Sequence, residues 1–137
     1  MKLIFLGTGT STGIPTIGID KPVCSSSDPK DVRMRSSVLL QIGDKNILID
    51  CSPDFRQQML KSKVSKIDAI LFTHEHSDHT AGLDDVRPIS FKHGKIPIFA
   101  HKRVISNLER RFDYLFDKKG YYTCLLYTSD AADELRS

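Results

Sequence analysis

The 137-residue chain lacks any apolar run that approaches the ~18 residues of a membrane-spanning helix, so no membrane association is expected. It shows no secretory leader, because Met1 leads directly into a strand-like segment and a Gly/Thr turn. Three cysteines are too few for a disulfide framework. The net charge of +3 is too mild to indicate a nucleic-acid-binding patch. With 39% hydrophobic and 27% charged residues, the sequence predicts a globular protein of the cytoplasm.

Three imidazoles and a carboxylate gather in the short segment HEHSDH, directly after the apolar run DAILF. The apolar run is typical of a buried strand. His74 and His76 are two residues apart and point the same way while the backbone stays extended. Asp78 and His79 follow as the chain turns, so they reach a second point in space. Histidine is the commonest transition-metal ligand, and the spacing therefore predicts two pairs of ligands for two metals. A lone histidine would instead be read as a surface residue.

The segment is similar to the H-x-H-x-D-H motif of the metallo-β-lactamase superfamily of hydrolases. Two further features of the superfamily occur in the expected order before the motif. The first is a strand followed by a Gly/Thr turn at 2–10, and the second is a strand that ends in Asp50. The run from Met1 to about Tyr121 resembles the phosphodiesterase-like branch, with its phosphoribosyl cyclic phosphate diesterases and relatives of the tRNA 3′-processing nucleases. The resemblance implies an α+β fold, as the N-terminal half of an αββα metallo-β-lactamase sandwich.

The resemblance also implies a role for each residue of the motif. By position, His74 and His76 would hold one metal, and Asp78 and His79 would hold the second. Asp78 is in addition the implied catalytic residue, since it would help to orient the nucleophile. Asp50 would orient the ligand loop from behind the ligands. The implied cofactors are two Zn²⁺ ions, and Mn²⁺ is an alternative that also suits a mixed histidine and carboxylate site.

The implied activity is hydrolysis of a small phosphodiester by a hydroxide that two metal ions activate. Two alternatives stay open. One is an RNA 3′-processing nuclease of the same superfamily, although no basic extension that would hold a nucleic acid is visible. The other is a non-catalytic metal-binding fragment, because four ligands leave the first metal undersupplied. A homodimer is a further expectation.

The C-terminal residues 124–137 resemble the conceptual translation of a transposon-based sequencing adaptor. We therefore expect a truncated domain over residues 1–123, followed by a tail at 124–137 that is not natural structure. A natural C-terminal tail is the alternative. The family's later ligands, two histidines and a bridging aspartate, would lie beyond this chain. Of the remaining histidines, His93 and His101 match no ligand position and are interpreted as solvated loop residues.

Truncation would have a physical cost. A half sandwich leaves one face of its sheet bare, and exposed apolar faces and strand edges favour association. The chain is therefore expected to be marginally stable or prone to aggregation.

Strands are predicted at 2–6, 37–42, 46–50, 67–72 and 96–100, and a hairpin turn at 43–45 joins the second to the third. Ser52 is predicted as the N-cap of a helix that has Pro53 at its first position and runs to Lys61. A last helix is predicted over 102–117, with one apolar stripe that packs in the core. The members of the stripe are Val104, Leu108, Phe112, Leu115 and Phe116.

Three other features are interpreted as structural or as lost functions. Gly7, Gly9 and Gly13 follow a strand, but their spacing and the following Pro15 argue against a phosphate-binding loop. They instead predict a tight loop that approaches a ligand near the metal site. Relatives carry a Cys-x-Cys-x-x-Cys zinc site where this chain has Cys24 alone, so that site is expected to be lost. The arginine at position 87 is expected to form a structural ion pair rather than to grip a phosphate.

Overall fold

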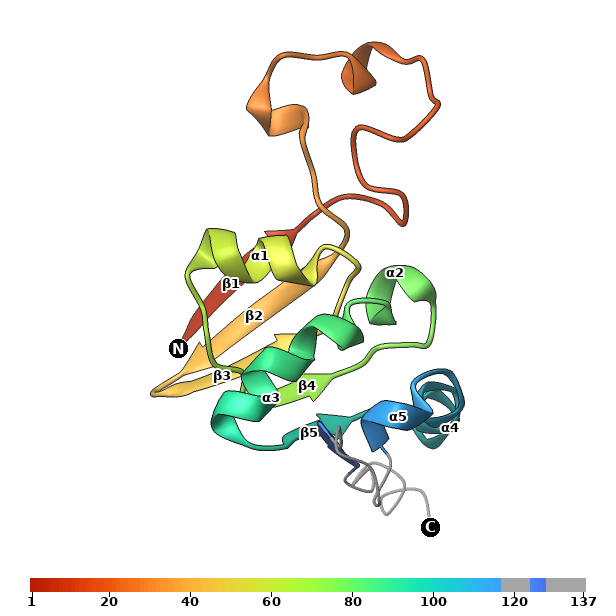
Figure 1. Ribbon diagram of the computed structural model, residues 1–137. Helices are drawn as coiled ribbons and strands as arrows, with labels where there is room; N and C mark the ends of the chain where they lie inside the picture. Colours follow the sequence, from red (N-terminus) through yellow and green to blue (C-terminus); the bar gives the residue numbers. More distant parts are fainter. Residues whose placement is uncertain (117–123, 128–137) are drawn as a thin grey trace.

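The computed structural model describes residues 1–116 and 124–127. A six-stranded sheet in the order β1-β2-β3-β4-β5-β6 runs through it (Figure 1). The first three strands pair antiparallel, and each later strand is parallel to the one before it. The strands are β1 (Lys2–Gly7), β2 (Ser37–Ile42), β3 (Lys45–Ile49), β4 (Ala69–Leu71), β5 (Ile96–Phe99) and β6 (Leu125–Tyr127).

Helices connect the parallel strands and also follow the fifth strand (Figure 1). The α-helices are α1 (Phe55–Ser62), α2 (Ser77–Thr80), α3 (Arg87–His93), α4 (Lys102–Arg111) and α5 (Asp113–Phe116). Three short 3₁₀ turns are η1 (Pro22–Cys24), η2 (Pro29–Asp31) and η3 (Leu83–Val86). Within residues 1–116 and 124–127, no helix has the length and apolar character needed to cross a bilayer.

The five predicted strands are all present, with ends that differ from the prediction by at most two residues. The predicted hairpin is confirmed as well, because Gly43 and Asp44 join β2 to β3 in a two-residue turn. Gly43 has φ 58°, a backbone conformation that glycine adopts without steric cost. The observed α+β architecture thus follows the pattern that the sequence predicts.

The start of α1 differs from the prediction. The helix begins at Phe55 with Asp54 as its N-cap, not at Pro53 with Ser52 as the cap. The reason is a turn before the helix, in which the amide of Phe55 donates to the carbonyl of Ser52 at 2.9 Å. The Ser52 hydroxyl still accepts from the Asp54 amide at 3.2 Å, as a capping side chain does, and it donates to Gln58 Oε1 at 3.1 Å.

The predicted last helix is divided in two. Helix α4 ends at Arg111, Phe112 leaves the helical conformation at φ −128° and ψ 41°, and α5 follows. The apolar stripe is nevertheless in the core as predicted, with Val104, Leu108, Phe112 and Leu115 buried and Phe116 packed against them. Residue 117 lies outside the described part of the chain.

One face of the sheet is buried beneath the helices. Leu39, Leu48, Ile70 and Ile98 stand in register on neighbouring strands, and all four side chains are fully buried. They pack with residues of α1 and α4 in one core cluster. Because side chains alternate along a strand, their neighbours in sequence must point to the other face.

That other face is apolar and bare over the described residues, as expected. A row of apolar side chains crosses five strands in register, and it consists of Phe5, Val38, Ile49, Leu71 and Phe99. Phe5 is 68% exposed, and Leu71 and Phe99 are each more than one-third exposed. A face of this kind favours association.

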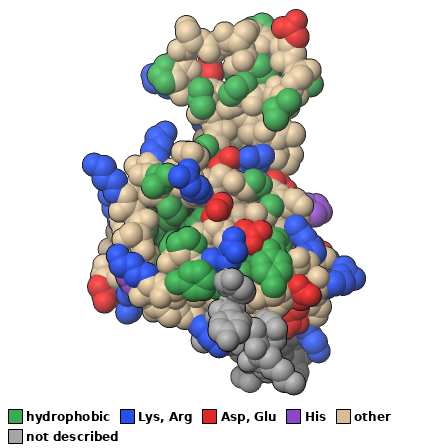
Figure 2. Space-filling model, in the orientation of Figure 1, with side chains coloured by type: hydrophobic (Ala, Val, Ile, Leu, Met, Phe, Trp, Pro, Cys, Tyr) green, Lys and Arg blue, Asp and Glu red, His purple; other side chains and the backbone are tan. Residues whose placement is uncertain are grey.

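An arm formed by residues 8–36 protrudes from the body of the molecule (Figures 1 and 2). The first and last residues of the arm are hydrogen-bonded to each other where the arm joins the sheet, since the Gly9 amide donates to the Met34 carbonyl at 2.7 Å. A Cβ atom on Gly7 would lie 2.0 Å from the carbonyl oxygen of Arg35. The first two glycines therefore permit close approach of the chain to its own backbone, and the approach of this loop to a ligand stays a prediction.

The C-terminal segment contributes one described strand. β6 pairs parallel with β5, and the side chains of Cys124 and Leu125 are buried. These residues fall inside the segment 124–137 that we expected to be adaptor-derived, and residues 128–137 lie outside the described part of the chain. The division into a domain at 1–123 and a tail at 124–137 stays a prediction.

Candidate metal centre

The ligand loop lies at the carboxyl end of β4. The strand ends at Leu71, the chain bends at Thr73, and α2 begins after His76, whose backbone is extended. The imidazole ring centroid of His74 lies 4.7 Å from that of His76 and 4.1 Å from that of His79. The structure thus brings together in one patch the three histidines that the motif singles out. The His79 ring lies closer to His74 than the His76 ring does, although the motif assigns His74 and His76 to one metal and His79 to the other.

Asp50 is the centre of the hydrogen bonds behind this patch. It follows β3 with φ 59°, and its amide donates to the Leu71 carbonyl at 2.9 Å. Its Oδ1 accepts from the Thr73 amide at 2.8 Å. Its Oδ2 lies 2.7 Å from both the Thr73 hydroxyl and His79 Nδ1. With the residue only 5% exposed, this buried carboxylate fixes the start of the ligand loop and the ring of one proposed ligand.

These contacts determine which ring nitrogen carries the proton. A carboxylate only accepts hydrogen bonds, so His79 must donate to Asp50 through Nδ1–H. The single hydroxyl proton of Thr73 also goes to Asp50, so its oxygen accepts from His74 Nδ1, 3.0 Å away. Both imidazoles therefore carry a proton on Nδ1, which makes Nε2 the ring atom through which each could bind a metal. This is how a carboxylate prepares a histidine to bind a metal.

The donor atoms fit a metal centre in part. His79 Nε2 lies 3.2 Å from Asp78 Oδ2. Two ligands at about 2.1 Å from a tetrahedral metal are about 3.4 Å apart, so this pair is spaced to share one ion. In residues 1–116 and 124–127, however, no group of three His, Cys, Asp or Glu side chains is arranged around one point. The four donors therefore do not complete a metal site among the described residues, and their division between two metals stays a prediction.

The backbone of residues 51 and 52 contacts the residues at the end of helix α2 and just after it. The Cys51 amide donates to the His79 carbonyl at 2.8 Å, and the Gly82 amide donates to the Cys51 carbonyl at 3.0 Å. A Cβ on Gly82 would lie 2.0 Å from the Ser52 carbonyl, so only glycine permits this approach. Complete burial raises the pKa of the Cys51 thiol well above its usual value, with smaller contributions from Asp85 and Asp50. The thiol stays protonated and acts as a packing residue.

The other candidates lie outside the patch. His93 and His101 are both exposed, and the His101 ring accepts from the Arg103 amide as the N-cap of α4. The interpretation of the arginine that begins α3 is confirmed. Arg87 Nε donates to the Asp84 carbonyl at 3.0 Å and lies 3.9 Å from the Asp84 carboxylate.

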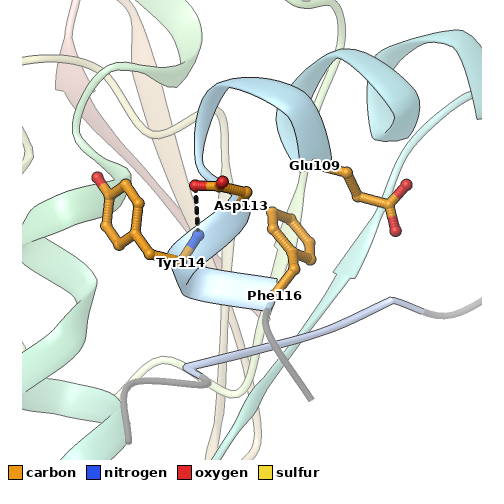
Figure 3. A pocket seen from close by; sticks show the side chains of 4 residues that line it. All are labelled: Glu109, Asp113, Tyr114 and Phe116. Atoms are coloured by element: carbon orange, nitrogen blue, oxygen red, sulfur yellow. Dashed lines mark hydrogen bonds between the residues drawn. The ribbon is translucent and has the colours of Figure 1, made fainter. Parts of the chain in front are cut away.

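A cavity of about 410 Å³ is lined by residues of α4 and α5 (Figure 3). Its lining residues are Glu109, Asp113, Tyr114 and Phe116. The Asp113 carboxylate accepts from the Tyr114 amide at 2.7 Å, and Glu109 points away from Tyr114. Burial and a hydrogen bond to Asp84 raise the Tyr114 pKa to about 12. With no histidine among its described lining residues and a phenol that stays protonated, the cavity does not show the chemistry of the histidine patch.

Two kinds of residue in the patch escaped the sequence analysis. Thr73 stands directly before the motif, and its place next to a histidine was the available signal for a residue that orients a ligand. Arg103 and Arg111 reach the loop from α4, and no local pattern indicates them.

Comparison with known proteins agrees with this geometry. The profile of the β-lactamase superfamily domain matches residues 45–132, which include Asp50 and the whole ligand loop. The chain belongs to the metallo-β-lactamase superfamily. The observed sheet and helices correspond to half of the fold of this superfamily, as the motif predicted.

A crystal structure of a diphosphatase from the PhnP family superposes with a TM-score of 0.84 at 46% identity, over 92% of this chain and 48% of that one. An octanoyltransferase of Porphyromonas gingivalis is 48% identical over 123 residues, which are 88% of this chain and 25% of that protein. A ribonuclease Z of Bradyrhizobium sp. is 34% identical over 84 residues, which are 60% of this chain and 23% of that protein. The chain thus spans about a quarter of these two curated relatives and about half of the solved structure.

Proposed function

We propose that the chain carries the first ligands of a divalent metal centre in a hydrolase that cleaves phosphodiesters. The observation that supports this most directly is the orientation of His74 and His79, whose Nδ1 atoms are held by Thr73 and Asp50, while Nε2 of His79 lies beside Asp78 Oδ2, the other proposed ligand of the same metal. A similar diphosphatase and a similar ribonuclease Z both act on phosphate esters or anhydrides, which favours phosphorus chemistry.

In this proposal His74 and His76 bind one metal, and Asp78 and His79 bind the second. When bound, divalent metals lower the pKa of a water molecule to about 7 and neutralise charge on phosphoryl oxygens. Zn²⁺ is the ion that a histidine-rich set favours, and Mn²⁺ suits the mixed set as well. Asp78 would both bind metal and accept a hydrogen bond from the nucleophile. Asp50 would hold His79 in the one tautomer that can bind.

The substrate class that we favour is a small phosphodiester. The arm of residues 8–36 carries exposed apolar side chains such as Ile17, which is 99% exposed, and Val32. Its four basic residues are nearly balanced by three acidic ones, so the arm offers little to the phosphate backbone of an RNA, which basic side chains bind. Processing of RNA 3′ ends is therefore the second candidate, supported by the similarity to ribonuclease Z.

For this polypeptide a non-catalytic role also has support. In the described part of the chain no three donors converge, so the metals would lack part of the shell that holds them. The cytoplasmic location and the homodimer that we predicted from the sequence stay predictions.

The test is release of p-nitrophenolate from bis-p-nitrophenyl phosphate by the purified chain with added Zn²⁺ or Mn²⁺. The monoester p-nitrophenyl phosphate and the β-lactam nitrocefin serve as comparison substrates. Metal-dependent cleavage of the diester, abolished in Asp78→Asn, would support the proposal. Cleavage of nitrocefin in preference to the diester would contradict it. Metal binding without turnover would favour the non-catalytic alternative.

A further inference from the structure

Arg111, the last residue of α4, binds the ligand loop at three points. Its Nη1 donates to the Glu75 carbonyl at 2.7 Å and to the Thr80 hydroxyl at 3.1 Å. Its Nη2 donates to the Ser77 hydroxyl at 3.3 Å. These partners lie 31 to 36 residues away in the sequence, so the contacts join two separate parts of the fold.

The three points of contact enclose the proposed ligands. Glu75 and Ser77 stand on either side of His76, and Thr80 directly follows His79. The Thr80 hydroxyl also links Arg111 to His76, because it accepts from the guanidinium and donates to the His76 carbonyl at 2.9 Å. One guanidinium therefore sets the course of the backbone through the second, third and fourth ligands.

The segment needs such support from outside. Helix α2 has only four residues, and a helix of this length does not hold its own shape. By contrast, α4 is anchored in the core by Val104 and Leu108, which are fully or almost fully buried. The planar fork of an arginine holds its donors in a fixed and spread geometry, whereas the three donors of a lysine ammonium share one atom on a flexible stem.

A second arginine makes a weaker contact with the same loop. Arg103 Nη2 lies 3.2 Å from Glu75 Oε2, but the arginine side chain is 71% exposed. Arg111 is exposed as well, but it makes three hydrogen bonds to the loop where Arg103 makes one, so Arg111 carries most of the connection between α4 and the loop.

Resting on the proposed metal centre, we propose that Arg111 is a positioning residue that holds His76, Asp78 and His79 in place for metal binding. Electrostatics alone gives the opposite expectation, because a guanidinium close to a divalent cation repels it. Removal of the charge would then strengthen metal binding, whereas loss of positioning would weaken it. The sign of the change in affinity therefore distinguishes the two effects.

The experiment measures Zn²⁺ affinity by competition with a chromophoric chelator in the wild-type chain, Arg111→Met, Arg111→Lys and Arg110→Met. Arg110 is the matched control, since it is the exposed neighbour on the same helix. We expect Arg111→Met to bind zinc about tenfold more weakly, Arg111→Lys to fall in between, and the control to match the wild type. Equal or tighter binding in Arg111→Met would overturn the inference.

Amide hydrogen exchange of residues 75–80 in the zinc-free chain is the second readout. Faster exchange in Arg111→Met than in the control, with other amides unchanged, is expected if Arg111 orders the loop. Unchanged exchange would overturn the inference whether or not zinc binds. Failure of the wild type to bind zinc would instead contradict the proposed function, so the two failures are distinguishable. If Arg111→Met does not fold, the same comparison is made with Arg111→Lys.

Discussion

Asp50 and His79 are 29 residues apart in sequence, and a 2.7 Å hydrogen bond joins the carboxylate Oδ2 of one to the ring Nδ1 of the other. The same carboxylate receives both the amide and the hydroxyl of Thr73. A single buried residue at the end of β3 thus holds the ligand loop that follows β4, because the parallel pairing of the two strands brings their carboxyl ends together.

Replacement of Asp50 by asparagine should weaken Zn²⁺ binding by about 10- to 100-fold, because the neutral amide polarises the His79 ring less and binds its proton less tightly. Asparagine tolerates the left-handed conformation at φ 59°, so the backbone should keep its course. Isothermal titration with Zn²⁺ measures the effect. Asp20→Asn, the same change on the exposed arm, is the control, and equal affinities in the two variants would contradict this role of Asp50.

The ion pair at the root of the arm should make stability depend on pH. Arg35 binds both carboxylate oxygens of Asp54 at 2.7 and 2.9 Å, and its amide donates to the same carboxylate. The hydrogen bond from the Arg35 side chain lowers the pKa of Asp54 against an opposing effect of burial. A lowered folded-state pKa contributes stability above about pH 4, and this stability is lost as the pH falls through the folded value.

Asp54→Asn should therefore reduce the free energy of unfolding by about 1–2 kcal/mol at neutral pH and by much less near pH 3. Urea unfolding at the two pH values measures the difference, with Asp20→Asn as control. A loss of stability of the same size at both pH values would mean that the charge of Asp54 is not the cause.

The three thiols should differ in reactivity. Cys51 and Cys124 are fully buried, whereas Cys24 is half-buried in the arm. Burial also keeps the Cys51 pKa high, so its reactive thiolate is scarce. A disulfide reagent should modify one thiol quickly in the native chain and all three in guanidinium chloride. Rapid reaction of Cys124 would show that the β6 segment does not pack as described.

The bare sheet face should make the chain associate. Leu3 and Phe5 project from β1 onto this face and are both more than half exposed. The double variant Leu3→Thr/Phe5→Thr should reduce association in sedimentation velocity and leave thermal unfolding nearly unchanged. Leu6→Thr is the contrast, because Leu6 is buried on the opposite face of the same strand and its loss should cost about 2–4 kcal/mol. A wild-type chain that is monomeric at high concentration and melts sharply would contradict this expectation.

Much of the fold could be predicted because local patterns report it. The alternation of apolar residues marks the strands, and the Gly43 turn marks the hairpin. The ligand loop was predictable too, since its ligands are adjacent in sequence and follow a buried strand. Asp50 was found only through resemblance, because nothing near it in the sequence reveals that it contacts Thr73 and His79.

Other features depend on the three-dimensional arrangement alone. The reach of Arg111 to the ligand loop requires knowing where α4 lies, so no sequence pattern could indicate it. The break at Phe112 was missed because the apolar stripe continues in register on both sides of it. Ser52 accepts from the Asp54 amide as the predicted cap would, but a turn over residues 52–55 delays the helix, so that Asp54 takes the cap position.

The measurement that tests the central claim most directly is Zn²⁺ titration of the wild-type chain, His79→Ala and His93→Ala. His93 is an exposed histidine at the end of α3 and controls for adventitious binding. The account predicts at most two ions bound by the wild type and by His93→Ala with equal affinity, and binding at least about tenfold weaker in His79→Ala. Absence of binding in the wild type, or equal binding in both variants, would contradict the assignment of this loop as a metal centre.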